Sequence, residues 1–271
     1  AYEASRLDDS ETKEILSKTY PYTILITEDD DEVRCFLERE LSPHFKTRTA
    51  ANGKDALRVL EEEEISLVVS DVMMPEMNGF ELCRMIKSQL PFSHIPVILL
   101  TALTDERQRI FGITGGADDY IQKPFHTDYV KIKIIHLLQE RQKLRERLLE
   151  KLRDNKLLLS EPEKVESIDD AFLRKFAEQI EAVYADPEYN VEKLSETLGL
   201  SRGHLHRKIK ELTGTAPVEF LRTYRLNKAT QLLRQNAYTV SEVAYRTGFS
   251  SPAYFSKCFK AVYGVTPTEY Q

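Results

Sequence analysis

Acidic side chains gather directly after two short apolar segments of this sequence. Glu28, Asp29, Asp30 and Asp31 follow the first segment, and Asp71 follows another. Carboxylates that converge in a small site cannot all stay ionised unless a cation compensates their charge. A hard divalent cation with oxygen ligands, most simply Mg²⁺, would relieve the repulsion. Taken alone, the carboxylates are equally consistent with a structural cation site or a solvated acidic loop.

Two further residues favour a reactive site over these alternatives. Thr101 and Lys123 end two other apolar segments, and Pro124 follows Lys123. A lysine and a divalent cation offset the charge of a phosphoryl group, and a threonine hydroxyl can donate a hydrogen bond to it. Asp71 would then be the nucleophile that accepts the phosphoryl group.

These residues can converge only if the apolar segments are strands of one sheet. The predicted strands are Tyr22–Thr27, Lys46–Ala50, Leu67–Ser70, Val97–Thr101 and Asp119–Ile121. The predicted helices are Glu32–Leu41, Lys54–Glu62, Gly79–Ser88, Asp105–Thr114 and one that begins at Thr127. Such β–α alternation predicts a five-stranded parallel sheet with helices on both faces. Ligands of such sheets bind at the carboxyl ends of the strands.

The helix that begins at Thr127 has no sequence signal for an end until Pro162. Four leucines recur within its charged second half and just before it, at spacings of seven, four and four residues: Leu137, Leu144, Leu148 and Leu152. This pattern predicts a long joining helix with a short coiled coil that pairs two chains. The alternative is a single charged linker helix whose leucines pack on their own domain.

The C-terminal part contains an internal repeat with a period of fifty residues. Five positions of one copy match five of the other: Leu205, Ile209, Leu212, Gly214 and Pro217 with Phe255, Phe259, Val262, Gly264 and Pro267. Each copy combines a short helix, a turn with glycine and a helix that a serine starts, which predicts two helix-turn-helix units in an all-α domain.

Length and charge agree with two domains of different function. The 271 residues suggest two domains, at roughly 100–150 residues each. Residues 1–139 hold 16 Lys and Arg against 25 Asp and Glu, whereas residues 199–271 hold 11 against 4. This asymmetry indicates a cation-binding half and a polyanion-binding half. No run approaches the ~20 apolar residues of a membrane-spanning helix and no secretory signal is present, so we expect a cytoplasmic protein.

Four ordered stretches resemble the signatures of response-regulator receiver domains: TILITEDDDEVR, LVVSDVMMPEMNGFELC, IPVILLTA and GADDYIQKPF. The resemblance covers about residues 22–140 and implies a flavodoxin-like fold. It implies that Asp71 is the phosphoacceptor and that a kinase phosphohistidine is the donor. It assigns the acidic pocket to Glu28 and Asp29, the phosphoryl contacts and the switch to Thr101, Lys123 and Tyr120, and the Mg²⁺ ligands to Asp29, Asp71, Glu28 and the Met73 carbonyl. Thr27 departs from the aliphatic residue usual in the family.

Residues 191–271 resemble the DNA-binding domain of the AraC/XylS family, which carries two helix-turn-helix units. The resemblance places these units at Val191–Leu198 with Ser201–Leu212, and at Val240–Thr247 with Ser251–Val262. The second helix of such a unit lies in the major groove. The residues predicted to face the groove include Arg202, Gly203, His206, Arg207, Tyr254, Ser256 and Lys257. Five other cations are predicted to contact phosphates or to solvate the surface: Lys208, Lys210, Arg222, Arg225 and Lys260. The apolar residues predicted to form the core are Leu205, Ile209, Phe255 and Phe259.

The two resemblances together predict four segments: a flexible lead-in at residues 1–20, a receiver at 21–139, a helical linker at 140–166 and an AraC-type domain at 167–271. This order is similar to the C-terminal part of hybrid two-component regulators. From this order we expect the chain to follow a kinase and a sensor, which would anchor the full-length protein in the inner membrane. The start at Ala1 rather than Met agrees with a fragment. A free-standing regulator is the alternative.

The predicted function is phosphorylation-controlled regulation of transcription, not enzymatic catalysis beyond assistance with the receiver's own phosphorylation and dephosphorylation. A histidine kinase domain would phosphorylate Asp71, and the modified chain would form a homodimer on a double-stranded DNA operator, with RNA polymerase as a further partner. Two other functions are considered: a relay that passes the phosphoryl group onward, and a constitutive DNA-binding protein with a merely structural receiver.

Overall fold

The computed structural model describes residues 14, 16–102, 116–153 and 167–271. The chain divides into two compact units, residues 1–143 and residues 144–271. We call them the receiver unit and the helical unit. Within the described ranges, no helix is both long and apolar enough to cross a membrane.

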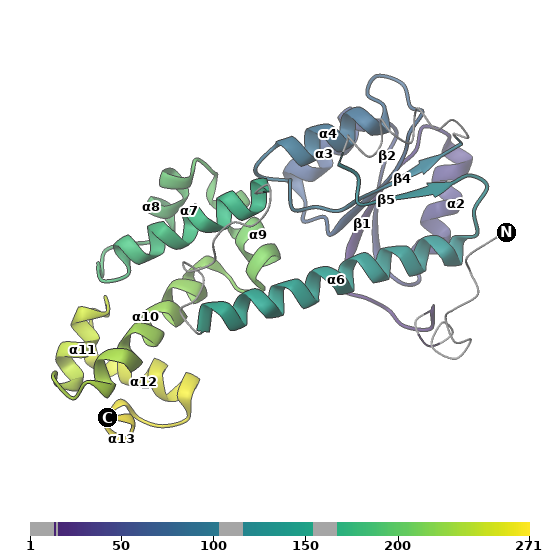
Figure 1. Cartoon of the computed structure of the whole chain (residues 1–271). Coiled ribbons are helices and arrows are strands. Elements are labelled where there is room, and N and C mark those ends of the chain that lie inside the picture. Colours follow the sequence, from purple (N-terminus) through teal and green to yellow (C-terminus); the bar gives the residue numbers. More distant parts are fainter. Residues whose placement is uncertain (1–13, 15, 103–115, 154–166) are drawn as a thin grey trace. The chain divides into compact units, whose positions relative to one another are not determined.

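Parallel strands form the sheet of the receiver unit (Figure 1). There are five, in the order β2-β1-β3-β4-β5. The strands are β1 Thr23–Thr27, β2 Lys46–Ala50, β3 Leu67–Asp71, β4 Val97–Thr101 and β5 Asp119–Gln122. β3 is the central strand and every one of its residues is buried, because it pairs with β1 and β4 and helices cover both faces. The predicted flavodoxin-like sheet is confirmed, and no predicted strand end differs by more than one residue.

Helices cover the two faces of the sheet with separate apolar clusters. On one face lie α2, Asp31–Leu41, and α6, Thr127–Arg153, which contribute Leu37 and Val130 among others to the first cluster. On the other face lie α3, Gly53–Glu62, and α4, Gly79–Ser88, which contribute Leu60 and Ile86 to the second cluster. The predicted helix Asp105–Thr114 falls outside the described residues.

The long helix α6 continues to Arg153 without a break, and residues 154–166 lie outside the described part of the chain. Leu137 packs against the first apolar cluster, as the single-helix alternative expects for this leucine. The side chains of Leu144, Leu148 and Leu152 are not among those described. The coiled coil therefore stays a prediction.

Seven helices make up the described part of the helical unit after α6. They are α7 Ile168–Val183, α8 Val191–Leu198, α9 Arg202–Thr213, α10 Pro217–Arg234, α11 Val240–Arg246, α12 Pro252–Tyr263 and α13 Pro267–Tyr270. Helices α8 and α9 form the first predicted helix-turn-helix unit, and α11 and α12 form the second. Ser201 and Ser251 cap α9 and α12, since each side chain accepts a hydrogen bond from a main-chain N–H of the first turn.

Residues that match in the fifty-residue repeat occupy equivalent places in the two units: in the core, at the end of the second helix and at the start of the next helix. Leu205 and Ile209 in α9 are fully buried, as are their counterparts Phe255 and Phe259 in α12, so the predicted core residues are confirmed. Gly214 and Gly264 end α9 and α12 with φ of 74° and 78°, a left-handed conformation that favours glycine. Pro217 and Pro267 then occupy the first position of the next helix, where no N–H is needed.

Candidate functional site

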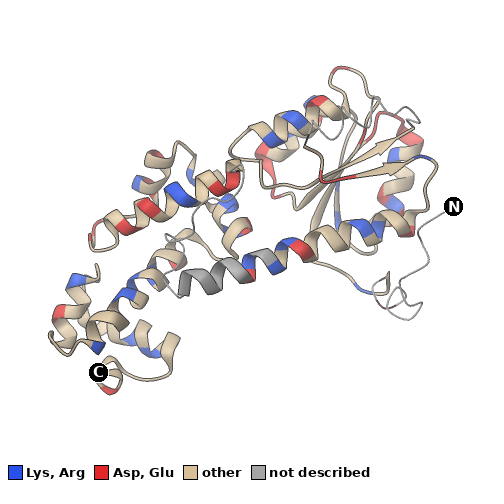
Figure 2. Ribbon diagram, viewed as in Figure 1, with Lys and Arg blue, Asp and Glu red and all other residues tan. Residues whose placement is uncertain are grey.

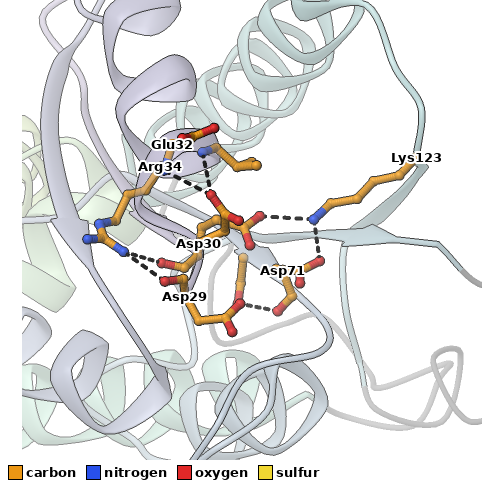
Figure 3. A network of polar contacts seen from close by, with 9 residues as sticks. Asp29, Asp30, Glu32, Arg34, Asp71 and Lys123 are labelled. Atoms are coloured by element: carbon orange, nitrogen blue, oxygen red, sulfur yellow. Dashed lines mark hydrogen bonds and ion pairs between the residues drawn. The ribbon is translucent and has the colours of Figure 1, made fainter.

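The carboxyl ends of β1 and β3 bring three carboxylates together. Glu28 and Asp29 follow β1, and Asp71 is the last residue of β3, the neighbour of β1 in the sheet. One oxygen atom of each residue lies within 4.8 Å of those of the other two. Lys123, which follows β5, reaches the same place (Figure 3): its Nζ lies 2.8 Å from Oδ1 of Asp71 and 2.9 Å from Oε2 of Glu28.

This arrangement leaves the site with more negative than positive charge. Glu28 is 2% exposed and Asp71 is 7% exposed. Burial raises the pKa of Glu28, and the charge of Asp71 adds to this, whereas the hydrogen bond from Lys123 opposes it. Burial by itself would lower the pKa of Lys123, but the hydrogen bonds to Asp71 and Glu28 outweigh it and raise the pKa. A single ammonium group therefore faces two buried carboxylates and the exposed Asp29.

The donor set fits a hard divalent cation. Glu28, Asp29 and Asp71 offer carboxylate oxygens, the ligands that Mg²⁺ prefers, and the exposed Asp29 leaves the site open to solvent on one side. Over the residues that the structure describes, this is the one group of three or more such side chains whose ligand atoms converge. Met73 lies two residues after Asp71, with a side chain that is 66% exposed. Its carbonyl belongs to the loop that leaves the site.

Thr101 lies on β4, the neighbour of β3, and Tyr120 lies on β5, the edge strand beyond β4. Thr101 ends β4, and its carbonyl accepts a hydrogen bond of 2.7 Å from the main-chain N–H of Lys123, which holds both residues at one edge of the sheet. Tyr120 lies in β5 and packs against the second apolar cluster with its hydroxyl buried. Burial raises the pKa of Tyr120 to about 12, so the phenol stays protonated at neutral pH.

Two residues support the site although sequence analysis gave them no role. Nη1 of Arg34, in α2, donates a hydrogen bond of 2.7 Å to the Glu28 carbonyl (Figure 3), and the same guanidinium pairs with Asp31. Gly79 begins α4 directly against β3, because a Cβ atom there would lie 2.1 Å from the Asp71 carbonyl oxygen. The dipeptide Asn78–Gly79 before a helix was a visible signal, but the backbone that Gly79 approaches appears only in the fold.

The residues predicted to face DNA lie on the solvent side of α9 and α12. Those that are exposed are Arg202, Gly203, His206, Tyr254 and Lys257, and those that are half-buried are Arg207 and Ser256. Two have local partners: Arg202 pairs with Glu192 at 2.7 Å, and the Ser256 hydroxyl donates to the Pro252 carbonyl at 2.9 Å. Helix α12 carries lysines and no carboxylate (Figure 2).

Two of the cations predicted to contact phosphates or to solvate the surface have partners within the protein itself. Lys208 is fully buried, and its Nζ lies 2.6 Å from Oδ1 of Asp169 in α7. The prediction of a surface role was wrong for Lys208, because the tertiary contact with α7 provides a carboxylate partner that makes burial of the charge tolerable. Arg225 is half-buried and donates hydrogen bonds to the carbonyls of Tyr184 and Asp186, at 2.7 and 2.6 Å. Its guanidinium is thus directed at the protein's own main chain.

Two family models match the chain. The response regulator receiver domain matches residues 24–135, and a helix-turn-helix domain matches residues 194–271. The first range contains the carboxylate site, and the second contains α9 and α12, the second helices of the two helix-turn-helix units, which are predicted to be the recognition helices. Helix α7 precedes the second range.

Several known proteins are similar to all or part of this chain. Histidine kinase P4 of Formosa agariphila is 37% identical over 265 residues, which are 98% of this chain and 19% of that protein. Transcriptional regulatory protein GltR of Pseudomonas aeruginosa is 43% identical over 121 residues, which are 44% of this chain and 50% of that protein. The chain thus spans a fifth to a half of the length of these relatives. A signal receiver domain of a histidine kinase from Syntrophus aciditrophicus is 38% identical with a TM-score of 0.42, over 44% of this chain and 91% of that one.

Proposed function

This chain joins a response regulator receiver domain, residues 24–135, to an AraC-type helix-turn-helix domain, residues 194–271, and from this pairing we propose that it is a phosphorylation-controlled transcription regulator. The observation that carries the proposal is the position of Asp71. It ends the central strand, lies within the carboxylate group with Glu28 and Asp29, and is 2.8 Å from the ammonium of Lys123. A buried nucleophile beside a cation at the ligand edge of an α/β sheet suits phosphoryl transfer.

In the proposed reaction, a carboxylate oxygen of Asp71 attacks the phosphorus of a kinase phosphohistidine. The P–O bond to Asp71 forms as the P–N bond breaks, and the histidine leaves. Lys123 stabilises the negative charge on the phosphoryl oxygens from one side, and Thr101 donates a hydrogen bond to one of them. A Mg²⁺ ion held by Asp29, Asp71, the Met73 carbonyl and, through its carboxylate, Glu28 would supply further positive charge there. The kinase domain is proposed to belong to the same full-length protein.

The proposed switch follows from the contacts that the new phosphoryl group changes. It competes with the Asp71 carboxylate for Lys123, and it draws the Thr101 hydroxyl toward itself. Tyr120 then turns into the space that Thr101 leaves, and the face to which α6 and β5 belong changes shape. The predicted helix Asp105–Thr114, the third part of this face, lies outside the described residues. Such a switch needs to bias an existing equilibrium by only a few kcal/mol.

The output is proposed to be pairing of two chains on DNA. A homodimer would place two helical units on neighbouring half-sites of a double-stranded operator, with Arg202, Gly203, His206 and Arg207 in one groove segment and Tyr254, Ser256 and Lys257 in the next. The proposed DNA-binding domain is residues 167–271, joined by a helical linker at 140–166 to a receiver at 21–139. RNA polymerase is a proposed further partner of the DNA-bound dimer.

The experiment that tests the proposal compares the solution mass of the chain with and without beryllofluoride plus Mg²⁺, which mimic the aspartyl phosphate. We expect the wild type to shift from monomer to dimer and Asp71→Asn to show no shift, because the variant lacks the carboxylate that holds the fluoride complex. Identical behaviour of the two proteins would contradict the switch.

A further inference from the structure

Helix α7 lies outside the matched helix-turn-helix range but contacts both units of it. The helix begins after Ser167, whose hydroxyl accepts a hydrogen bond from the Asp170 N–H at 3.1 Å while the Asp170 carboxylate accepts one from the Ser167 N–H at 3.3 Å. This capping box fixes where the helix starts. Its buried side chains, among them Phe172 and Phe176, are part of the helical unit's interior, and Phe176 packs edge-on against Phe220 of α10 at 4.8 Å.

The first turn of α7 is tied to the first recognition helix. Asp169 receives the 2.6 Å contact from the fully buried Lys208 of α9. The Lys208 ammonium also lies 5.1 Å from the centre of the Phe172 ring, which provides a second favourable electrostatic contact. Because Lys208 follows the groove-facing Arg207 directly in sequence, its burial fixes the rotation of α9 about its own axis.

The end of α7 is tied to the second helix-turn-helix unit through α10. Arg225 of α10 bridges the carbonyls of Tyr184 and Asp186, which follow α7. Gly248, in the turn between α11 and α12, packs closely against the Tyr184 carbonyl and the Arg225 guanidinium. A Cβ atom at this position would lie 2.1 Å from the Tyr184 carbonyl oxygen and 2.8 Å from Nε of Arg225. Nearby, Lys228 of α10 pairs with Glu181 of α7 at 2.8 Å.

We propose that α7 acts as a brace that sets the position of the two recognition helices relative to one another, with Lys208 and Arg225 as its positioning residues. The inference rests on the proposed DNA-binding function. Successive major-groove segments are about 34 Å apart along one face of a duplex, so two helices of one domain bind both only if their separation and rotation are fixed. The brace reaches α9 at one end and the turn before α12 at the other.

Arg225 allows a clear test, because a positioning role requires the geometry of the guanidinium, whereas a phosphate contact requires only its positive charge. A planar guanidinium can donate in two fixed directions to two carbonyls, and an ammonium cannot reproduce that fork. A phosphate contact, in contrast, would survive Arg225→Lys, since the charge is kept. Removal of a phosphate contact would also lower the slope of log affinity against log salt by roughly 0.9.

The binding experiment uses the full 271-residue chain and a duplex selected from a randomised library by the wild type. We expect Arg225→Lys to weaken binding at least tenfold on the selected two-segment duplex, to change binding less than twofold on a duplex that keeps one segment, and to leave the salt slope unchanged. The control is Lys260→Gln, which removes an exposed cation of α12 and should lower the salt slope. Wild-type affinity in Arg225→Lys, or a lower salt slope in Arg225→Gln, would overturn the proposal.

A second measurement needs no DNA and therefore separates this inference from the proposed function. Spin labels at His206→Cys and Lys257→Cys, in a chain whose exposed Cys35 is replaced by serine, report the distance between α9 and α12 by pulsed electron paramagnetic resonance. We expect a narrow distribution in the parent and a broadened or shifted one in Arg225→Lys, with helix content unchanged by circular dichroism. An unchanged distance distribution in Arg225→Lys would contradict the proposed role of α7 as a brace, even if DNA binding is confirmed. If the wild type selects no DNA, the proposed function fails and this measurement still decides the brace.

Discussion

The receiver unit buries two carboxylates, Glu28 and Asp71, that share the ammonium of Lys123, whereas the helical unit buries an ammonium, Lys208, against the carboxylate of Asp169. The first arrangement has excess negative charge and opens toward solvent at Asp29, and the second is a balanced pair inside the unit. An unbalanced cluster is poised to take a cation or a phosphoryl group. A balanced pair is suited to fixing the geometry of helices.

Buried hydroxyl groups differ between the two units in the same way. Thr27, beside the carboxylate site, is 1% exposed, and its hydroxyl has no hydrogen-bond partner among the described residues. Thr213, at the end of α9, is also 1% exposed, but its hydroxyl donates to the Ile209 carbonyl at 2.7 Å. The difference teaches that residue type alone does not reveal whether a buried polar group serves reactivity or architecture; its partners do.

The strongest test of this comparison is the same substitution in both units. Asp169→Asn removes the carboxylate that pairs with Lys208, and breaking a buried pair in this way should cost about 3 kcal/mol of unfolding free energy. Asp71→Asn removes one of two carboxylates that repel each other, and should raise the stability by on the order of 1 kcal/mol. Urea unfolding followed by circular dichroism measures both, since the chain has no tryptophan.

The matched control is Glu192→Gln, which breaks the exposed pair with Arg202. An exposed pair contributes less than about 1 kcal/mol, so this variant should remain close to the wild type. A loss of stability in Asp71→Asn as large as that in Asp169→Asn would mean that both carboxylates are architectural.

Alanine in place of a glycine in the first turn of one helix of each unit should sharpen the comparison with a smaller effect. Gly79→Ala would place a Cβ atom 2.1 Å from the Asp71 carbonyl oxygen, and the forced shift of α4 should cost about 1–3 kcal/mol. Gly203→Ala in α9 meets no atom within 4 Å and should stabilise the helical unit by about 0.5–1 kcal/mol. Thermal unfolding of the two variants separates these signs, and equal midpoints would show that α4 does not depend on its close approach to β3.

Valine in place of the two buried threonines tests the hydroxyl groups directly. Thr27→Val removes an unsatisfied hydroxyl with little change of shape and should stabilise the receiver unit by about 1 kcal/mol. Thr213→Val removes a satisfied hydroxyl and should destabilise the helical unit by about 0.5–1.5 kcal/mol. Chemical unfolding of both variants shows whether each substitution raises or lowers the free energy of unfolding. A loss of stability in Thr27→Val would indicate that the hydroxyl has a partner, such as an ordered water.

The smallest expected effect is a pH dependence confined to the carboxylate site. Burial raises the pKa of Glu28 above its usual 4.5, so the folded chain binds a proton that the unfolded chain has already released. The contribution of Glu28 to stability is therefore most favourable at low pH, and it declines as pH rises from 4.5 through the raised pKa. Urea titrations across this window should show the decline in the wild type and not in Glu28→Gln. If the unfolding free energies of the two proteins depend on pH in the same way, Glu28 is not the source of the decline.

Sequence reasoning served the two units unequally, and physical causes explain the difference. Strands alternate with helices in the receiver unit, so the rule that parallel strands end at one edge was enough to bring Glu28, Asp29 and Asp71 together with Lys123. In the helical unit the internal repeat and the resemblance to the AraC/XylS family located the ends of α8, α9, α11 and α12 within one residue. The partner of Lys208 lies 39 residues earlier, in another helix. No local pattern connects such positions, so a buried lysine was mistaken for a surface cation.

The capping box at Ser167 has a consequence for how such proteins can be recombined. If the brace formed by α7 belongs with the recognition helices, a gene fusion that moves the helical unit onto another input domain must join upstream of Ser167. A junction between Asp170 and Leu194 would keep the whole matched range and discard Asp169, the partner of Lys208. The portable module is therefore longer than its recognisable sequence signature, and crossovers that respect only the signature should yield chimaeras that fold poorly.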